Sequence, residues 1–129
     1  MLERRLKEID LLRRKYGELD HGANVEWVIF RSFKLPSGWN RQVTRLLIIV
    51  PPGYPMTPPD NFYVEPRLKL ASGSGVANYS EPVSQLEQTW GQFSYHVDSS
   101  DWKATEDILS GHNLLTFMLG VEKRLSELN

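Results

Sequence analysis

The sequence predicts an α+β fold, an antiparallel sheet of about four strands with an N-terminal helix and a C-terminal helix packed on it. Helical periodicity of apolar residues at both ends of the chain and β-branched, apolar segments between them support this prediction. The chain has 129 residues, of which 40% are hydrophobic and 24% are charged. We therefore expect residues 1–129 to form a single globular domain around one hydrophobic core.

Charge and composition exclude several classes of protein. Fifteen Lys and Arg residues against sixteen Asp and Glu residues give a net charge of −1, which disfavours a general nucleic-acid binder. No apolar segment approaches the ~20 residues of a membrane span, and the charged first residues do not resemble a secretory signal, so we expect a cytoplasmic protein. The absence of cysteine excludes disulfides and cysteine nucleophiles. We expect no metal and no cofactor, because no His, Asp and Glu set has metal-ligand spacing.

The first element is expected to be an amphipathic helix over residues 2–16. Apolar side chains recur there at helical spacing, at Leu2, Leu6, Ile9, Leu12 and Tyr16. Basic residues dominate the opposite face, among them Arg4, Arg5 and Arg13. This face is either solvated or a docking surface for a partner protein.

Two β-branched and aromatic segments, residues 25–33 and 43–50, predict an antiparallel hairpin. Its turn contains Trp39, which we expect to be exposed, and an exposed aromatic side chain at a loop tip can mark a binding surface. Five of the eight prolines then fall in residues 51–59. Proline has no backbone N–H and a fixed φ, so regular strand pairing stops there. Residues 61–64 can form one more short strand.

Residues 71–89 are polar and rich in Gly and Ser, so we expect an irregular loop of the kind found at active sites, or a flexible segment. Thr105 is expected to cap a helix whose first turn holds Glu106 and Asp107. Apolar residues at helical spacing extend this C-terminal helix to about Leu128.

The proline-rich segment has two interpretations. The pattern Pro55-x-x-Pro58 is typical of ligands of SH3-type grooves, which would make the protein an adaptor. The segment lies directly between two predicted strands, however, where an exposed ligand peptide is rare. A rigid, packed turn is therefore favoured.

Residues 51–59 follow the pattern Pro-x-x-Tyr-Pro-x-x-Pro-Pro after an apolar strand and before Phe62. This pattern resembles the signature of the ubiquitin-conjugating enzyme (UBC) family. The order of helix, hairpin and strand is similar too, as is Trp102 before the last helix. Residues 60–63 and 90–107 look most like the bacterial branch called prokaryotic UBC family E, which is associated with bacterial ubiquitin-like conjugation operons.

The resemblance implies a UBC-like fold. It also implies a protein that accepts a ubiquitin-like protein from an activating enzyme and passes it to an amine on a target protein. In the family, the first helix docks the activating enzyme, and the hairpin loop and proline turn help to contact partners. The candidate partner-binding residues are therefore Arg4, Arg5, Arg13, Trp39, Tyr54 and Met56.

The chain departs from the family at the nucleophile. The family's catalytic cysteine cannot exist here, and the His-Pro-Asn motif upstream of it is not recognisable. At the family's spacing from the Trp before the last helix, here Trp102, the position of the cysteine is occupied by Ser94. The resemblance therefore implies Ser94 as the residue that would carry the ubiquitin-like protein.

Ser94 and His96 project to the same side of an extended segment, because they are two residues apart. A serine hydroxyl needs an adjacent base to attack an acyl donor, and histidine suits that role at neutral pH. Asp98, Asp101 or Asp107 could orient the imidazole, and we take Asp107 as the candidate. The product would be an oxyester between Ser94 and the C-terminus of the ubiquitin-like protein.

Two functions remain open at this point. An oxyester is a weaker acyl donor than a thioester, so an enzyme would need to polarise the carbonyl, by Asn78 or by backbone N–H groups of residues 71–89. The alternative is an inactive UBC-like scaffold that binds a ubiquitin-like protein or a partner enzyme without covalent chemistry. An exposed Ser94 hydroxyl near His96 favours the enzyme, and a buried Ser94 bonded to backbone favours the scaffold.

Overall fold

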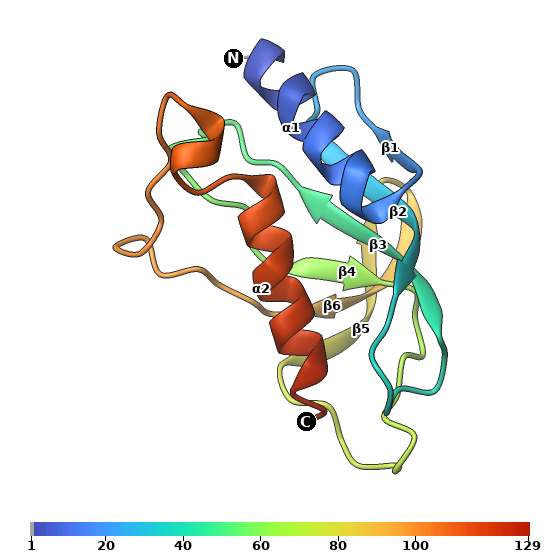
Figure 1. Ribbon diagram of the computed structural model, residues 1–129. Coiled ribbons are helices and arrows are strands. Elements are labelled where there is room, and N and C mark those ends of the chain that lie inside the picture. The colour runs from blue at the N-terminus through green and yellow to red at the C-terminus, as the bar shows by residue number, and fades with distance from the viewer. Residues whose placement is uncertain (1) are drawn as a thin grey trace.

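The structure is a computed structural model that describes residues 2–129 (Figure 1). Its elements in chain order are α1 (Leu2–Tyr16), β1 (Leu19–His21), β2 (Trp27–Lys34), β3 (Val43–Ile49), β4 (Phe62–Val64), β5 (Tyr79–Gln85), β6 (Gln88–Phe93), the 3-10 helix η1 (Ile108–Ser110) and α2 (Leu114–Ser126). All strands join one antiparallel sheet in the order β1-β2-β3-β4-β6-β5. The predicted α+β class is confirmed, with six strands rather than about four.

The main core lies between one face of the sheet and the two helices, which pack on that same face (Figure 1). The apolar side of α1 contributes Ile9 and Leu12, and α2 contributes Phe117 and Val121. Each of these side chains is at most 1% exposed. Burial of this apolar surface is the main force that holds both helices against the sheet.

The expectation of an irregular loop over residues 71–89 is wrong in its second half. Strands β5 and β6 form a hairpin closed by the pair Gln85 and Gln88. The two turn residues, Leu86 and Glu87, have φ values of 52° and 59°. These values suit a type I′ turn, which usually contains Asn or Gly at these positions. The sequence lacks that signal, so the hairpin was not apparent from it.

The hairpin also covers the second face of the sheet, and its ribbon curves behind β3 (Figure 1). A second apolar cluster lies there, built on Ile29, Leu47, Tyr63 and Trp90. The Trp90 indole N–H donates to the carbonyl of Gln85 at 3.1 Å, which fixes the ring under the hairpin turn. The sheet is therefore packed on both faces, by helices on one and by its own hairpin on the other.

The last helix begins later than expected. Asp107 caps η1, and Asn113 rather than Thr105 caps α2, with Thr116 completing a capping box. The chain between the two helices is held against an earlier segment, since the Gly111 region lies against Lys103. A Cβ on Gly111 would lie 2.5 Å from the Lys103 carbonyl oxygen. Gly111 is extended, with φ −145° and ψ −164°, and separates η1 from α2 where apolar spacing alone predicted one continuous helix.

The proline-rich segment forms a packed turn. Tyr54 is fully buried, and its hydroxyl donates to Glu8 at 2.5 Å. The Trp102 indole N–H donates to the Pro55 carbonyl at 2.8 Å. Met56 is 80% exposed, and Pro52, Gly53 and Thr57 are exposed beside it. The turn is therefore tied to α1 and to the segment before η1 rather than presented as a free peptide.

Glu8 is the centre of this contact. Its carboxylate is completely buried and accepts hydrogen bonds from Arg4 Nε at 2.9 Å, from the Tyr54 hydroxyl and from Leu114 N at 2.6 Å. Arg4 also donates to the Thr105 carbonyl. Glu8 thus joins the proline turn to the first turn of α2, and Arg4 links this contact to the segment before η1.

Candidate functional site

Ser94 lies directly after β6 and is exposed. Its backbone N–H donates to the carbonyl of Asn78 at 2.8 Å, which continues the β5–β6 pairing by one residue. Within residues 2–129 the Ser94 hydroxyl has no hydrogen-bond partner. The backbone of Ser94 is thus fixed by the sheet, while its side chain is exposed and unbonded.

The next residue, Tyr95, points the other way. Its ring packs edge-on against Phe62 at 5.8 Å and Phe117 at 5.6 Å between ring centroids. Burial also raises the pKa of the Tyr95 hydroxyl. Because side chains alternate along an extended segment, Ser94 and His96 lie on the opposite, exposed side.

His96 is paired with Asp60, which comes directly after the proline turn. The imidazole Nδ1 contacts Asp60 Oδ1, and the two side chains are 67% and 63% exposed. In the neutral imidazole an Nδ1–H donated to the carboxylate leaves Nε2 as a proton acceptor. Ser94 and His96 are both exposed on the same side of this segment. Within residues 2–129 no hydrogen bond joins the two side chains.

The acid assigned to His96 from the sequence, Asp107, has other partners. Its carboxylate accepts from the Ser110 hydroxyl at 2.6 Å and from Leu109 N at 3.2 Å, as the cap of η1. Asp98 likewise accepts from the N–H and the hydroxyl of Ser100. The structure therefore brings Asp60, which sequence reasoning missed, to His96 in place of these two carboxylates.

Register explains how Asp60 reaches His96. Phe62 of β4 pairs with Phe93 of β6, so the residues just before β4 lie beside those just after β6. Phe62 and Phe93 also stack at 4.7 Å between ring centroids. The sequence alone would reveal this adjacency only if β4 were paired with β6, although β5 lies between them in the chain.

The capping role of Asp107 gives a testable pH dependence. The hydrogen bond from Ser110 and then that from Leu109 N lower the pKa of the Asp107 carboxyl. Its capping contribution is therefore complete above the unfolded-state pKa and is lost as the pH falls through the lower folded-state pKa. We expect Ser110→Ala to raise the Asp107 pKa toward its ordinary value, so that η1 frays at a higher pH. Carboxyl 13C titration by NMR checks this, and an unchanged Asp107 titration would contradict it.

Three of the candidate partner-binding residues are buried, which corrects the expectation that they face a partner. Trp39 is 6% exposed, since its ring packs in the main core and its indole N–H donates to the Leu125 carbonyl at 2.8 Å. Arg5 is 6% exposed and donates to backbone carbonyls, including that of Pro51 at 3.0 Å. Tyr54 is the third, since its hydroxyl is bonded to Glu8 in the core.

The other three candidates differ in how available they are. The Arg4 side chain is 15% exposed and committed to Glu8. Arg13 on α1 is exposed, and Met56 on the proline turn is the most exposed large hydrophobic residue that the structure describes. Of the six candidates, Arg13 and Met56 are therefore free to touch a partner.

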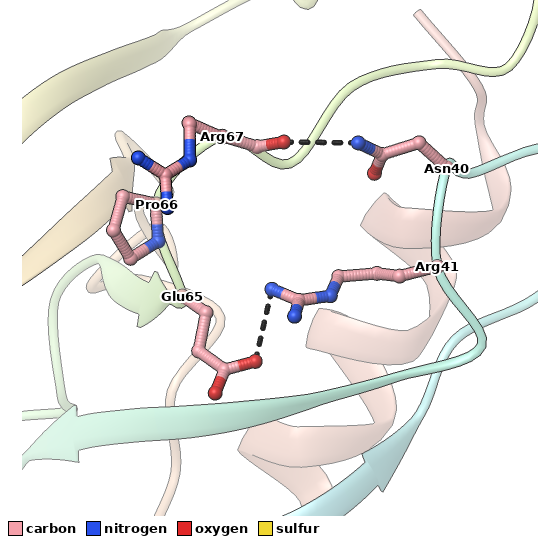
Figure 2. A pocket seen from close by; sticks show the side chains of 5 residues that line it. All are labelled: Asn40, Arg41, Glu65, Pro66 and Arg67. Atoms are coloured by element: carbon pink, nitrogen blue, oxygen red, sulfur yellow. Dashed lines mark hydrogen bonds and ion pairs between the residues drawn. The ribbon is translucent and has the colours of Figure 1, made fainter.

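A separate surface pocket of about 440 Å³ is lined by Asn40, Arg41, Glu65, Pro66 and Arg67 (Figure 2). Arg41 Nη1 lies 2.9 Å from Glu65 Oε2, and Asn40 Nδ2 donates to the Arg67 carbonyl at 3.0 Å. The pocket contains none of the site residues expected from the sequence. Two of its charged side chains, Arg41 and Glu65, pair with each other.

Two further features of residues 2–129 bear on function. No three His, Asp or Glu side chains gather there as a metal ion would require. Neither helix in that part of the chain has the length and apolar character needed to cross a bilayer.

Comparison with known proteins gives one match. The family model described as prokaryotic E2 family E matches residues 3–127. No curated protein and no solved structure matches the chain. The match includes the proline turn, the segment with Ser94 and His96, and both helices. The chain therefore belongs to prokaryotic E2 family E, and this membership suggests a role in ubiquitin-like conjugation.

Proposed function

We propose that the protein accepts a ubiquitin-like protein from an activating enzyme and transfers it to a target amine through an oxyester on Ser94. One observation supports this chemistry above all: an exposed serine with an unbonded hydroxyl shares a surface with a histidine that is already paired with a carboxylate, Asp60. A serine nucleophile needs such a base, and the base needs such a partner.

The first step forms the oxyester. Ser94 Oγ attacks the C-terminal carbonyl of the ubiquitin-like protein, which the activating enzyme presents as a thioester. His96 Nε2 takes the hydroxyl proton, the C–S bond breaks, and the departing thiolate receives that proton. In the second step a target amine attacks the oxyester. The C–O bond breaks, an amide forms, and the amine proton passes through His96 to Ser94 Oγ.

Asp60 supports this sequence by fixing the imidazole. A carboxylate on Nδ1 holds the tautomer that leaves Nε2 as the acceptor, and it stabilises the imidazolium that forms. General-base catalysis of this type contributes about 10²–10⁴-fold to a rate. A catalytic hydrogen bond often tightens only when substrate binds, so Ser94 and His96 need not be bonded in the free protein.

Asn78 is the proposed group for polarising the acyl carbonyl. It lies beside Ser94 in the sheet register, because its carbonyl accepts the Ser94 N–H. It is exposed, and its side-chain amide has no hydrogen-bond partner within residues 2–129. An amide donor next to the nucleophile would stabilise the oxyanion that develops during acyl transfer.

The inactive scaffold is the second candidate. It is favoured by the lack of a Ser94–His96 hydrogen bond within the described residues and by the strong exposure of His96 and Asp60. In that case the same surface binds a ubiquitin-like protein, and no bond to Ser94 forms.

A charging assay separates the two candidates. The protein is mixed with a cognate activating enzyme, ubiquitin-like protein and ATP, and its intact mass is measured. We expect an adduct that mild hydroxylamine cleaves, that Ser94→Ala abolishes, and that His96→Ala slows by about 10²-fold or more. Ser99→Ala, in the nearby exposed segment, is the matched control and should charge normally.

The scaffold would give a different result in the same assay. A saturable complex that carries no covalent adduct, and that survives Ser94→Ala, would establish the scaffold. An adduct that resists hydroxylamine would instead indicate an amide on a lysine.

A further inference from the structure

We propose that Asn61 is a positioning residue that holds Ser94 and His96 in register with Asp60. This inference rests on the function proposed above, and it adds a residue that touches no substrate. It follows from how a single residue grips the backbone between the serine and the histidine.

Asn61 bonds both backbone groups of Tyr95. Its own N–H donates to the Tyr95 carbonyl at 2.7 Å, and its side-chain Oδ1 accepts from Tyr95 N at 3.1 Å. The first contact needs only a backbone, and the second needs an acceptor at this position. Tyr95 is the residue between Ser94 and His96, so the two bonds fix the backbone that links the serine to the histidine.

The backbone of Asn61 also turns the chain at this point. Its φ is 64°, in the left-handed region where Asn is one of the few tolerated residues besides Gly. The preceding residue, Asp60, contacts His96. One left-handed residue thus aims its side chain at Tyr95 and its neighbour's carboxylate at the imidazole.

The side chain of Tyr95 supplies the third anchor. Its ring packs between Phe62 and Phe117, and its hydroxyl lies over Gly120 of α2, where a Cβ would come within 2.1 Å. The ring therefore occupies space that only glycine leaves free. With its ring held by the core and its backbone held by Asn61, Tyr95 has little freedom to move.

The backbone of Ser94, the residue before Tyr95, is fixed independently of Asn61. Ser94 N donates to the Asn78 carbonyl, a contact that does not involve Asn61. The Asn61 side chain thus acts on the Tyr95–His96 part of the segment, downstream of an already anchored serine. Its loss should alter the placement of His96 relative to Ser94 more than the fold as a whole.

The test compares Asn61→Gly with Asn61→Asp. Glycine keeps the left-handed backbone and its N–H but removes the acceptor, and aspartate keeps both. We expect Asn61→Gly to speed hydrogen exchange at the Tyr95 amide by about tenfold while the Ser94 amide keeps its protection. We expect the same variant to slow adduct formation by about 10²-fold, as for a misplacement near 1 Å. Asn61→Asp should restore both readouts.

Two results would overturn the proposal. The first is a Tyr95 amide that stays protected in Asn61→Gly. The second is a Tyr95 amide that loses protection while adduct formation keeps its wild-type rate. If the wild-type protein forms no adduct, the proposed function fails by itself. The order parameter of the His96 ring, measured by 13C relaxation, then tests the positioning role. A lower order parameter in Asn61→Gly that Asn61→Asp restores supports it, and an unchanged order parameter overturns it.

Discussion

Glu8→Ala is expected to lower the free energy of unfolding by about 3–5 kcal/mol, the usual cost of removing one partner from a buried ion pair. The Glu8 carboxylate is fully buried and accepts from Arg4, the Tyr54 hydroxyl and Leu114 N. Alanine would leave three donors without an acceptor, and two of them lie in the buried interior. Since small domains are stable by about 5–15 kcal/mol, this is a large share of the total.

Urea denaturation followed by tryptophan fluorescence measures the loss. Glu3→Ala is the matched control on the same helix, because the Glu3 side chain is 83% exposed and its contact with Lys7 is a surface pair at 3.4 Å. The control should change stability by less than about 0.5 kcal/mol. A Glu8→Ala variant as stable as Glu3→Ala would show that the buried carboxylate does not hold the proline turn.

Trp90→Ala is expected to cost about 3–5 kcal/mol, as for other fully buried aromatic residues. Trp90 is 1% exposed and forms the second apolar cluster with Ile29, Leu47 and Tyr63. Its N–H anchors the Gln85 carbonyl. Alanine would therefore empty the space beneath the β5–β6 hairpin and release its turn from the sheet.

Limited proteolysis reports this local effect separately from the global one. We expect new cleavage between residues 84 and 89 in Trp90→Ala, at a urea concentration where the wild type is intact. Trp90→Phe keeps most of the ring and loses the N–H, so it should protect the hairpin better than alanine does. Cleavage at equal rates in all three proteins would mean that the hairpin is held by strand pairing alone.

Local patterns predicted the parts of the fold that depend on local chemistry. The spacing of apolar residues predicts α1 in full. For the last helix it predicts the end to within a few residues but places the start too early. Proline chemistry gave the rigid turn at residues 51–59, since a residue without an N–H cannot continue a ladder. These features depend on periodicity and backbone donors, which are visible in a single sequence.

Other expectations failed where distant parts of the chain decide the outcome. The local setting of Trp39 and Arg5, a turn and a basic helix face, predicts that both side chains lie on the surface. Each is buried, and its donors are satisfied by distant carbonyls, at Leu125 for Trp39 and at Pro51 for Arg5. No local pattern encodes such partners, since they lie 86 and 46 residues away in the chain.

The candidate site also contains residues that local patterns predict and one residue that depends on the order of the sheet. Ser94 came from a family spacing and His96 from strand alternation, both of which are local. Their roles remain proposals. Asp60 comes from the pairing of β4 with β6, which are not consecutive strands. A contact 36 residues away along the chain follows from sheet order, so the sequence offered nearby aspartates in its place.

The order of the sheet leaves β5 at one edge, next to the segment that carries Ser94. A free edge strand invites the strand of another molecule to add to it, which leads to aggregation. In β5 the pairing register shifts between Ser80 and Val83, and Pro82 within that interval has no N–H to offer. A bulge and a proline are the devices that close an edge. The surface that carries Ser94 and His96 can thus stay open beside a sheet edge that resists pairing with another copy.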